Sequence, residues 1–517
     1  MRIIQTFWSG NKDTILDASY GWYNSMYHIM GWVLSSNLLS KLYNELELYT
    51  DKKGYELLIT ELKLPYTKVH VLLDDLNTYD SNLWALSKLH VYSLQKKPFL
   101  HVDGDVFIWE KFDKNLLQSK LIVQNLERGT DYYKNKWIKL KEDFVFIPEE
   151  ILEEESKSEN MYAYNFGIFG GSDLKFIEKY TNLSFKFVKE NIKNISKEKY
   201  LDFNVFFEQY LFFCLSNKKK KKVSSFLNKT YNDNEYVGFG DFKKVPKKKY
   251  LHLIGHYKRD LDVCKQMARQ LLIEFPSEYL NILKIFSLNE YNAFATLFSV
   301  NKNPTSYKRY SDFYGSLSLQ IKFLKTKQIL IKQYLYTSED INTVFISKKN
   351  IENELIELKN EELNNVFKYE EKIQEFLQSL THLDYLKNIN DDYQNFKEYP
   401  VSISNLTKSS IIKAKDYLII KSKYMLCDSE HNSYSEDLNE KQARVIIPSS
   451  IYPYYDEVIF DDLDNFIFNE VSNSTYNNLI NKIKKYFDSE DIKDNYKGFL
   501  KLINGRIENL LYKRILK

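Results

Sequence analysis

Long apolar runs are missing from this sequence, in which no stretch approaches the roughly 18 uninterrupted apolar residues that a membrane-spanning helix requires. The N-terminus also lacks the apolar segment and small-residue cleavage site of an export signal. Cysteine is scarce: Cys214, Cys264 and Cys427 lie far apart and show no Cys-x-x-Cys spacing. This pattern supports neither a disulfide framework nor a thiolate zinc site, and it predicts a cytoplasmic location.

An excess of charge of one sign is missing as well, because 73 lysines and arginines face 70 aspartates and glutamates, for a net charge of +3. This near-equal number of positive and negative residues argues against a nucleic acid as the main partner. With 44% hydrophobic and 28% charged residues, the composition is that of a globular chain. Its 517 residues predict two or three domains, at roughly 100 to 200 residues per domain.

Glycine and tryptophan are unevenly distributed along the chain. After Gly255 only Gly315, Gly498 and Gly505 remain of the 15 glycines, and all six tryptophans lie within the first 137 residues. Because glycine marks tight turns and places where the backbone approaches a ligand, we expect a functional site in the N-terminal half. We therefore predict a site-bearing domain over residues 1–275 and a separate accessory domain over residues 276–517.

Short apolar runs alternate with helical patterns in the N-terminal half. This alternation predicts an α/β fold with a mostly parallel mixed sheet flanked by helices. Ligands bind at the carboxyl ends of the strands in such sheets, so the residues that follow the strands are expected along one rim. The predicted strands and the two clearest helices are Arg2–Phe7, Glu45–Tyr49, Lys68–Leu73 and Phe99–Val102, and Met26–Leu42 and Trp84–Leu94. The rim residues are Thr6–Gly10, Tyr49–Asp51, Asp74–Asp75 and Asp103–Asp105.

Beyond residue 285 the pattern becomes that of an α-rich domain with a small β element. Helical stretches cover Ile351–Leu380 and Tyr476–Leu516. Strand-like segments lie between them at Tyr417–Leu426, Ala443–Ile447 and Glu457–Phe460.

Two charged segments, Glu149–Glu159 and Lys218–Lys222, stand out in the N-terminal half. Solvated loops are the first interpretation of both. The acidic segment is alternatively a mobile lid beside the site, and the lysine run is alternatively a patch that approaches a membrane surface.

The sharpest local feature is an apolar strand that ends in two carboxylates, in the run His101-Val102-Asp103-Gly104-Asp105. Two acids at positions i and i+2 around a small residue can converge on one hard divalent cation where the backbone turns. Mg²⁺ and Mn²⁺ prefer oxygen ligands and keep open positions for substrate phosphates. The motif predicts a divalent-cation site, and its alternative is a pair of surface carboxylates in an ordinary turn.

Three further segments follow in order: Tyr164–Gly171, Asp202–Gln209 and His252–Lys258. Together with the Asp-x-Asp motif they resemble the GT-A glycosyltransferases, especially the retaining nucleotide-sugar enzymes of the glycogenin and bacterial lipooligosaccharide galactosyltransferase type. Those enzymes have an Asp-x-Asp after the central strand and an Asn-x-Gly strand. They also have an acid-plus-Gln pair in a helix and a closing His-x-x-Gly-x-x-Lys.

The resemblance covers about residues 1–270. Two shorter segments, Phe7–Gly10 and Asp103–Trp109, also resemble those of an uncharacterised bacterial group related to these enzymes.

The resemblance implies that Asp103, Asp105 and a neutral His252 hold Mn²⁺ or Mg²⁺. The cation would bridge the diphosphate of a UDP-sugar and neutralise charge on the leaving group. Lys258 is expected to add a positive charge to the same diphosphate, and Gly255 to let the backbone approach it. For His252 the alternative is a histidine that only completes a strand end.

The resemblance also suggests which residues act at the transferred sugar. Gln209 is implied beside the anomeric carbon, where a polar group stabilises an oxocarbenium-like transition state. The family usually has Asp-Gln at this place, so Glu208 departs from the pattern, and Asp202 is a second candidate for the acid. Asn165 and Gly167 suit a strand over which the sugar passes closely, and a bulged structural strand is their alternative.

The remaining candidates are donor-binding residues. Lys88 lies on the helix before the Asp-x-Asp strand, where related enzymes often place a basic residue that faces the donor. Thr6, Phe7 and Trp8, with Asp75, are expected to frame the base and ribose. A solvated lysine and a core tryptophan are the alternatives for Lys88 and Trp8.

The resemblance as a whole implies a metal-dependent, retaining glycosyltransferase that uses a UDP-sugar, with an accessory domain that binds the acceptor or a partner. Without an enzymic nucleophile, retention follows a front-face path that depends on positioning and charge stabilisation. A peptide or protein is the first acceptor class, and a cell-envelope or lipid-linked glycan, reached by peripheral membrane contact, is the second. A non-catalytic nucleotide-sugar-binding scaffold is the main rival. A metal-dependent phosphohydrolase is weakened by the lack of a dense second cluster of His and Asp ligands.

Overall fold

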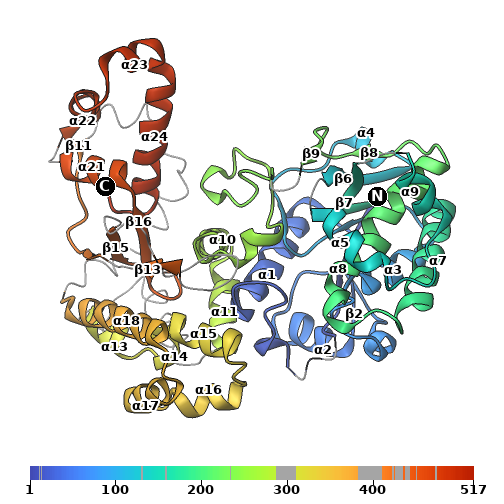
Figure 1. Ribbon diagram of the computed structural model, residues 1–517, viewed down its shortest axis with the longest axis horizontal. Helices are drawn as coiled ribbons and strands as arrows, with labels where there is room; N and C mark the ends of the chain where they lie inside the picture. Colours follow the sequence, from blue (N-terminus) through green and yellow to red (C-terminus); the bar gives the residue numbers. More distant parts are fainter. Residues whose placement is uncertain are drawn as a thin grey trace. The chain divides into compact units, whose positions relative to one another are not determined.

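The computed structural model describes residues 1–10, 12, 14–129, 132–157, 160–232, 235–286, 310–381, 410–421, 424–425, 435–436, 443–449, 451–471 and 474–516. The chain forms two compact units (Figure 1). The N-terminal unit comprises Met1–Phe242 and Pro246–Arg259, and the C-terminal unit comprises Lys243–Val245 and Asp260–Lys517. The division at 275/276 into a site-bearing and an accessory domain stays a prediction about function.

The N-terminal unit is built on a mixed sheet of eight strands among its described residues. Neighbouring strands run in the order β3-β2-β1-β4-β7-β6-β8, and β9 also pairs with β6. The block from β3 to β4 is parallel, β7 is antiparallel to both of its neighbours, and β8 and β9 are parallel to β6. The strands are β1 (Arg2–Phe7), β2 (Leu46–Thr50), β3 (Lys68–Val71), β4 (Phe99–Val102), β6 (Leu121–Gly129), β7 (Met161–Gly171), β8 (Ser224–Ser225) and β9 (Tyr231–Asn232).

Both faces of this sheet are apolar, since successive side chains of a strand point to opposite faces and both sets are buried. Ile4, Phe99 and Phe169 belong to one buried cluster, and their chain neighbours Ile3 and Leu100 belong to another. The sheet is therefore covered on both sides, which confirms the predicted α/β fold with a mostly parallel mixed sheet flanked by helices. The α-helices of this unit are α1 (Ser25–Leu42), α2 (Lys52–Tyr55), α3 (Ala85–Ser93), α4 (Lys114–Leu117), α5 (Tyr132–Lys141), α6 (Glu149–Glu155), α7 (Leu174–Asn191), α8 (Tyr200–Val205) and α9 (Leu211–Lys218).

A short second sheet continues from the edge where the parallel strands end. After β4 the chain turns through Asp103, Gly104 and Asp105 into β5 (Val106–Ile108), which pairs antiparallel with β10 (Tyr250–His252). A 3₁₀ turn, η7 (Gly255–Arg259), follows β10 closely. This pairing brings two segments about 145 residues apart in the chain to one edge of the sheet.

The segment Asp202–Gln209 lies in a run of three helical segments, α8, η5 and α9. Between α8 and α9 the backbone forms a π-helical segment, η5 (Phe206–Tyr210), which contains Glu208 and Gln209. Short π-helical segments inside α-helices occur frequently at functional sites. The pair therefore lies at a local irregularity rather than on an even helix face.

The C-terminal unit is α-rich with a small β element, as predicted. A three-stranded antiparallel sheet has the order β12-β15-β16, and two smaller sheets are the pairs β11-β17 and β13-β14. The strands are β11 (Ser410–Ile411), β12 (Leu418–Lys421), β13 (Tyr424–Met425), β14 (Ser435–Glu436), β15 (Ala443–Pro448), β16 (Tyr455–Phe460) and β17 (Ser474–Thr475). The helices are α10 (Leu261–Glu274), α11 (Pro276–Phe286), α13 (Tyr310–Gly315), α14 (Leu319–Lys322), α15 (Leu324–Gln333), α16 (Ser338–Val344), α17 (Lys348–Leu358), α18 (Glu361–Ser379), α21 (Asp462–Glu470), α22 (Tyr476–Lys484), α23 (Ser489–Asp494) and α24 (Tyr496–Tyr512).

Two helical predictions in this unit were too long. The stretch Ile351–Leu380 is broken, because Lys359 adopts a left-handed backbone (φ 50°) and Asn360 caps the next helix by accepting from the Leu363 amide. The stretch Tyr476–Leu516 divides into α22, α23 and α24. Residues 422, 423 and 426 of the predicted strand segment 417–426, and Cys427, lie outside the described residues.

The loop interpretation of the acidic segment Glu149–Glu159 was wrong for residues 149–155. Residues 149–155 form α6, and Lys218 at the end of α9 pairs with Glu149 at 2.8 Å and with Glu153 at 2.7 Å. Residues 158 and 159 lie outside the described residues. The lysine run is also partly engaged, because Lys221 pairs with Asp173 at 2.6 Å.

None of the helices formed by the described residues has both the length and the apolar character needed to cross a membrane.

Candidate metal centre

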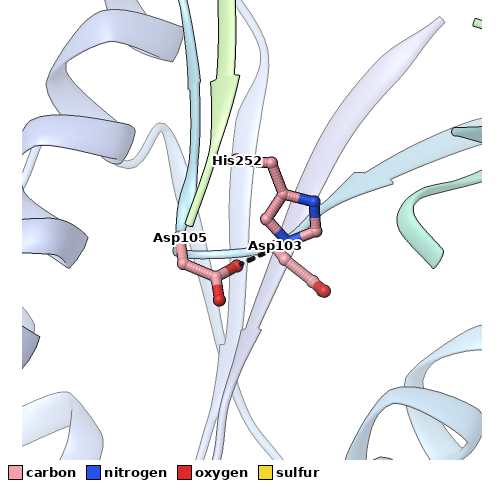
Figure 2. A group of neighbouring side chains, drawn as sticks. All are labelled: Asp103, Asp105 and His252. Carbon is pink, nitrogen blue, oxygen red and sulfur yellow. Dashed lines mark ion pairs between the residues drawn. The ribbon is translucent and has the colours of Figure 1, made fainter. Parts of the chain in front are cut away.

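Two carboxylates and an imidazole converge at the edge of the sheet (Figure 2). Asp103 and Asp105 come from the turn between β4 and β5, and His252 ends β10, opposite Val106 in the β5–β10 pair. One ligand atom of each of the three lies within 4.8 Å of the others. The structure thus brings together the three residues proposed from sequence as metal ligands.

The glycine of the turn allows a close approach by an aromatic ring. A β-carbon at Gly104 would lie 2.5 Å from the ring of Trp32, which α1 presses against the turn. The indole nitrogen of Trp32 donates to Nε2 of His28 at 3.0 Å. Burial and the charge of Lys258 lower the pKa of His28 to about 3, so this ring is neutral and can accept. The turn therefore rests on a fixed aromatic support.

Asp105 is held by two positive or polar groups. Lys258 Nζ lies 3.0 Å from Asp105 Oδ2, and His252 Nε2 lies 3.4 Å from Asp105 Oδ1. Burial disfavours the charged carboxylate, but the charge of Lys258, the largest of the opposing effects, lowers the pKa of Asp105. Lys258 lies in η7, which begins at Gly255, where a positive φ of 55° favours glycine.

Asp103 is held by a buried lysine that also holds Glu208. Lys88 Nζ lies 3.1 Å from Asp103 Oδ1 and 2.8 Å from Glu208 Oε1. Burial opposes the charge of Lys88, but the two carboxylates outweigh it and raise the pKa of Lys88. Burial, and after it repulsion from Asp103, raises the pKa of Glu208 despite the lysine. Lys88 is thus a buried bridge between the Asp-x-Asp turn and the π-helical segment, and not a solvated helix lysine.

Gln209 and Asp202 have different surroundings from Glu208. The hydroxyl of Tyr133 lies 2.9 Å from Gln209 Oε1, and Gln209 Nε2 lies 3.4 Å from Glu208 Oε2. Asp202 pairs with Lys136 and not with Lys88. Of the two candidate acids, the structure places Glu208 next to the Asp-x-Asp turn and Asp202 in a separate ion pair.

Asn165 and Gly167 lie on β7, beside the site. Asn165 Oδ1 accepts from the Gly167 amide at 2.9 Å, and Asn165 Nδ2 donates to Glu127 Oε1 at 2.8 Å. Tyr133 and Tyr236 donate to the same Glu127 carboxylate. Through Tyr133 this buried network on β6 reaches Gln209.

The residues expected at the base and ribose occupy the rim in different ways. Phe7 is buried at the end of β1 and packs edge-on against Trp32, with ring centroids 5.2 Å apart. Trp8 is also buried and donates to Asn77 Oδ1 at 2.9 Å, in agreement with the core alternative for this residue. The Thr6 hydroxyl is buried and has no hydrogen-bond partner among the described residues, and Asp75 is exposed just after β3.

Sequence reasoning missed three residues of this region, Trp32, Gln124 and Glu127. Gln124 and Glu127 follow the apolar run Leu121-Ile122-Val123 within β6. A buried polar residue in a strand that is otherwise apolar needs hydrogen-bond partners, so such positions are a signal for a functional network. Trp32 carries no comparable local signal.

The donor set fits a divalent cation such as Mn²⁺ or Mg²⁺. Asp103 and Asp105 offer carboxylate oxygens, which these cations prefer, and His252 directs Nε2 toward Asp105. Lys88 and Lys258 place two ammonium groups against the same carboxylates. The two carboxylates of the turn therefore already lie next to positive charge.

The fold and the site define a class of protein. It is an α/β protein whose parallel strands end at an acidic turn that suits a divalent cation. The chain belongs to DUF6734, described as a family of unknown function, whose model matches residues 1–285. No curated protein matches the sequence.

Solved structures of glycosyltransferases match part of this chain. The glycosyltransferase GlyE of Streptococcus pneumoniae is 9% identical, with 50% of this chain and 56% of that chain covered and a TM-score of 0.26. The galactosyltransferase LgtC, in complex with donor and acceptor sugar analogues, is 11% identical, with 61% and 100% covered and a TM-score of 0.29. Mouse xyloside xylosyltransferase 1 is 12% identical, with 43% and 84% covered and a TM-score of 0.24. The chain thus spans about half the length of GlyE, and similarities of this size define neither donor nor acceptor.

Proposed function

We propose that this protein is a metal-dependent glycosyltransferase that moves a sugar from a UDP-sugar to an acceptor. The observation that carries the proposal is the convergence of Asp103, Asp105 and His252 within 4.8 Å, with Lys258 paired to Asp105. This arrangement lies at the carboxyl edge of parallel strands, where α/β sheets bind ligands. The intact set favours an enzyme over a non-catalytic scaffold that keeps only the fold.

The departing diphosphate is the group that these residues would serve. A cation held by Asp103, Asp105 and His252 would supply neutralisation of the charge that builds on that leaving group. Lys258 is within reach of the same place, because it contacts Asp105. Its ammonium group would bind the diphosphate as a point charge.

The sugar would be handled by the residues behind the metal centre. Lys88 keeps Glu208 next to Asp103, and Gln209 follows directly in the π-helical segment. A polar side chain and a carboxylate held in fixed positions can stabilise positive charge at an anomeric carbon. We propose retention of configuration on a front-face path, in which a donor phosphate oxygen takes the acceptor proton and positioning replaces a strong base.

A peptide or protein is the proposed acceptor class, with the C-terminal unit as its binding partner. The alternative, a cell-envelope or lipid-linked glycan, relied on the charge of Lys218–Lys222. Two of these lysines already pair with acidic residues of this chain, since Lys218 contacts Glu149 and Glu153, and Lys221 contacts Asp173. The run therefore presents less free positive charge than its sequence indicates.

The test is a panel of UDP-, GDP- and dTDP-sugars, with and without Mn²⁺, read by thermal shift and by donor hydrolysis. Ligand at a hundred times its Kd adds roughly 2.7 kcal/mol to stability, which a thermal shift detects. We expect a Mn²⁺-dependent response to one UDP-sugar that is lost in an Asp103→Asn, Asp105→Asn double variant. The matched control is Glu178→Gln, a change at an exposed position of α7.

Each outcome of this panel has a distinct meaning. Binding of UDP with Mn²⁺ but without hydrolysis or transfer to any acceptor would support the scaffold alternative. No response to any nucleotide sugar from folded protein would refute the proposed function.

A further inference from the structure

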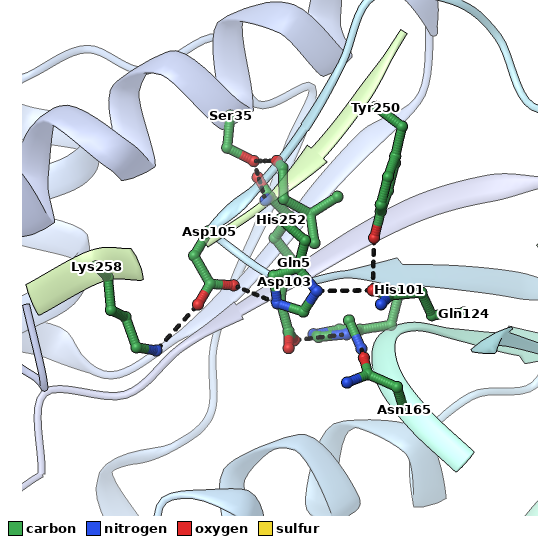
Figure 3. A network of polar contacts seen from close by, with 12 residues as sticks. Gln5, Ser35, His101, Asp103, Asp105, Gln124, Asn165, Tyr250, His252 and Lys258 are labelled. Atoms are coloured by element: carbon green, nitrogen blue, oxygen red, sulfur yellow. Dashed lines mark hydrogen bonds and ion pairs between the residues drawn. The ribbon is translucent and has the colours of Figure 1, made fainter. Parts of the chain in front are cut away.

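His252 offers one ring nitrogen to the acidic turn and has the other engaged. Nε2 faces Asp105 at 3.4 Å, and Nδ1 lies 2.7 Å from Oε1 of Gln124 (Figure 3). Gln124 is fully buried on β6, so its side-chain amide forms its hydrogen bonds with protein groups. Which of the two ring nitrogens carries the proton is decided by this contact.

Neighbouring hydrogen bonds fix which end of the Gln124 amide faces His252. Its Nε2 donates to Asn125 Oδ1 at 2.9 Å, and Asn125 Nδ2 in turn donates to Leu126 O at 3.0 Å. The Tyr250 hydroxyl donates to Gln124 Oε1 at 2.5 Å. With the amide oxygen facing the ring, Nδ1 carries a proton, so in the neutral ring Nε2 is the bare nitrogen, on the side of the carboxylates.

The backbone makes room for this contact at one place. The β6–β7 ladder shifts register there, because Val123 pairs with Phe169 while Asn125 pairs with Asn165. Four residue steps of β7 thus oppose two of β6, an irregularity of the kind that re-aims side chains beside active sites. A β-carbon at Gly167, inside the irregular part, would lie 2.5 Å from the His252 ring.

We propose that Gln124 is a positioning residue that holds His252 in the tautomer with a bare Nε2, the form that can bind a divalent cation. This inference rests on the proposed metal site. Histidines that bind metals usually donate their second N–H to an oxygen, which fixes the ring and strengthens it as a ligand. In this chain a neutral amide fills that role, so the ring gains orientation without an additional negative charge next to Asp103 and Asp105.

A core amide that only fills space would not have this arrangement. Both donors to its oxygen, Tyr250 and His252, come from β10, and its nitrogen is turned away to Asn125. Gln124 therefore ties the strand that carries His252 to the central sheet that carries the Asp-x-Asp turn. The same bond sets both the position and the protonation of the ring.

The test uses three variants of the full chain. Gln124→Met removes the acceptor at similar size, and Gln124→Glu keeps an oxygen that accepts from Nδ1. Tyr250→Phe is the matched control, because it removes the other donor to the same oxygen and leaves the His252 contact in place. Folding is checked by thermal unfolding of each variant.

The first readout needs no metal. NMR of ¹⁵N-histidine-labelled protein at a pH where the ring is neutral reports the tautomer of His252, assigned by comparison with His252→Gln. We expect the Nδ1-protonated form in the wild type, in Gln124→Glu and in Tyr250→Phe, and a shift toward the other tautomer in Gln124→Met. An unchanged tautomer in Gln124→Met would overturn the proposal.

The second readout is the Kd for Mn²⁺ alone, measured by titration calorimetry. We expect about 10- to 100-fold weaker binding in Gln124→Met, the usual range for a lost outer partner of a metal ligand. Gln124→Glu should recover most of that loss, and Tyr250→Phe should stay within about threefold of the wild type. Equal Mn²⁺ affinity in the wild type and in Gln124→Met would contradict only the inference about Gln124. A wild type that does not bind Mn²⁺ would contradict the proposed metal site. In that case the NMR result for the tautomer still decides the role of Gln124.

Discussion

Lys258 donates to Asp105, with Nζ 3.0 Å from Oδ2, so a lysine proposed for the donor diphosphate is bound to a proposed metal ligand. Lys258 and a cation bound at the turn would compete for the Asp105 carboxylate. A cation at Asp105 repels the ammonium group, and a diphosphate attracts it, so the lysine is expected to change partner as donor and metal bind together. Metal binding and nucleotide binding should therefore be coupled through this residue.

Lys258→Met separates the contact of the lysine with Asp105 from its proposed contact with the diphosphate. Without the ammonium group, Mn²⁺ alone should bind several-fold more tightly, because Asp105 no longer has a competing partner. UDP in the presence of Mn²⁺ should bind at least about 10-fold more weakly, because a charge-assisted bond to phosphate is lost. Titration calorimetry with Mn²⁺, and then with UDP at saturating Mn²⁺, measures both values.

Lys258→Arg is the control for this experiment, since it keeps the charge and changes only the shape of the head group. We expect it to resemble the wild type in Mn²⁺ affinity and to lose less UDP affinity than Lys258→Met. If both affinities fall together in Lys258→Met, the lysine supports the turn and does not exchange partners.

Gly167→Ala tests the close packing around His252. The new methyl group would lie 2.5 Å from the ring, so either the ring or Gln124 must move. We expect a loss of about 1 to 3 kcal/mol in the free energy of unfolding, as in overpacked cores, together with weaker Mn²⁺ binding. Urea unfolding and calorimetry give the two quantities.

Gly505→Ala is the matched control, because Gly505 is an exposed residue inside α24 and a β-carbon there meets nothing within 4 Å. Alanine in a helix interior stabilises by roughly 0.5 to 1 kcal/mol relative to glycine. A Gly167→Ala variant that behaves like Gly505→Ala would show that the site has more room than its geometry indicates.

Glu208→Gln and Asp202→Asn distinguish the two acids near Gln209. Glu208 is buried against Lys88 at 2.8 Å, beside Asp103, whereas Asp202 pairs with Lys136. We expect Glu208→Gln to lower donor hydrolysis or transfer at least about 10-fold, because it removes a fixed charge next to the proposed reaction centre. Asp202→Asn should change the rate less than about threefold, and the reverse order of effects would assign the acid to Asp202.

The rim of the site was predictable because its determinants are local. The apolar run Phe99–Val102 forms β4 with the predicted bounds, and β1 and β4 are parallel, so their carboxyl ends share one edge. The strand alternation alone therefore placed Asp103 and Asp105 on the rim. The approach of His252 to that turn depends on the β5–β10 pair, a long-range contact that no local pattern encodes. It was expected only from the resemblance to GT-A enzymes.

The hydrogen-bond partners of the site were harder to predict. Gln124 and Glu127 are polar residues in an apolar strand, but their roles depend on where Tyr250, Tyr133 and Asn165 come to lie after folding. The break after Leu358 was missed because the apolar spacing of α17 and α18 continues across it. The cap at Asn360 and the left-handed Lys359 decide that boundary.

Glu370 predicts how stability depends on pH in the C-terminal unit. Its buried carboxyl group accepts from the amides of Lys325 and Thr326, at 2.6 and 3.0 Å, at the start of α15. Burial raises the pKa of Glu370 to about 7. Between the ordinary glutamate pKa and about 7, the folded chain keeps this proton while the unfolded chain releases it, so stability falls as pH rises through that window.

Glu370→Gln should remove this dependence, because the amide carries no titrating proton. The expected effect is a loss of roughly 3 kcal/mol in the wild type between pH 4.5 and pH 8 that is much smaller in the variant. Urea unfolding followed by far-UV circular dichroism measures it, and Glu375→Gln, at an exposed position of the same helix, is the control. All six tryptophans lie in the first 137 residues, so their fluorescence follows the N-terminal unit and should show the same pH profile in both variants. A wild type whose C-terminal unit grows more stable from pH 5 to pH 7, with Glu370→Gln unchanged in slope, would show that Glu370 is ionised in the folded chain.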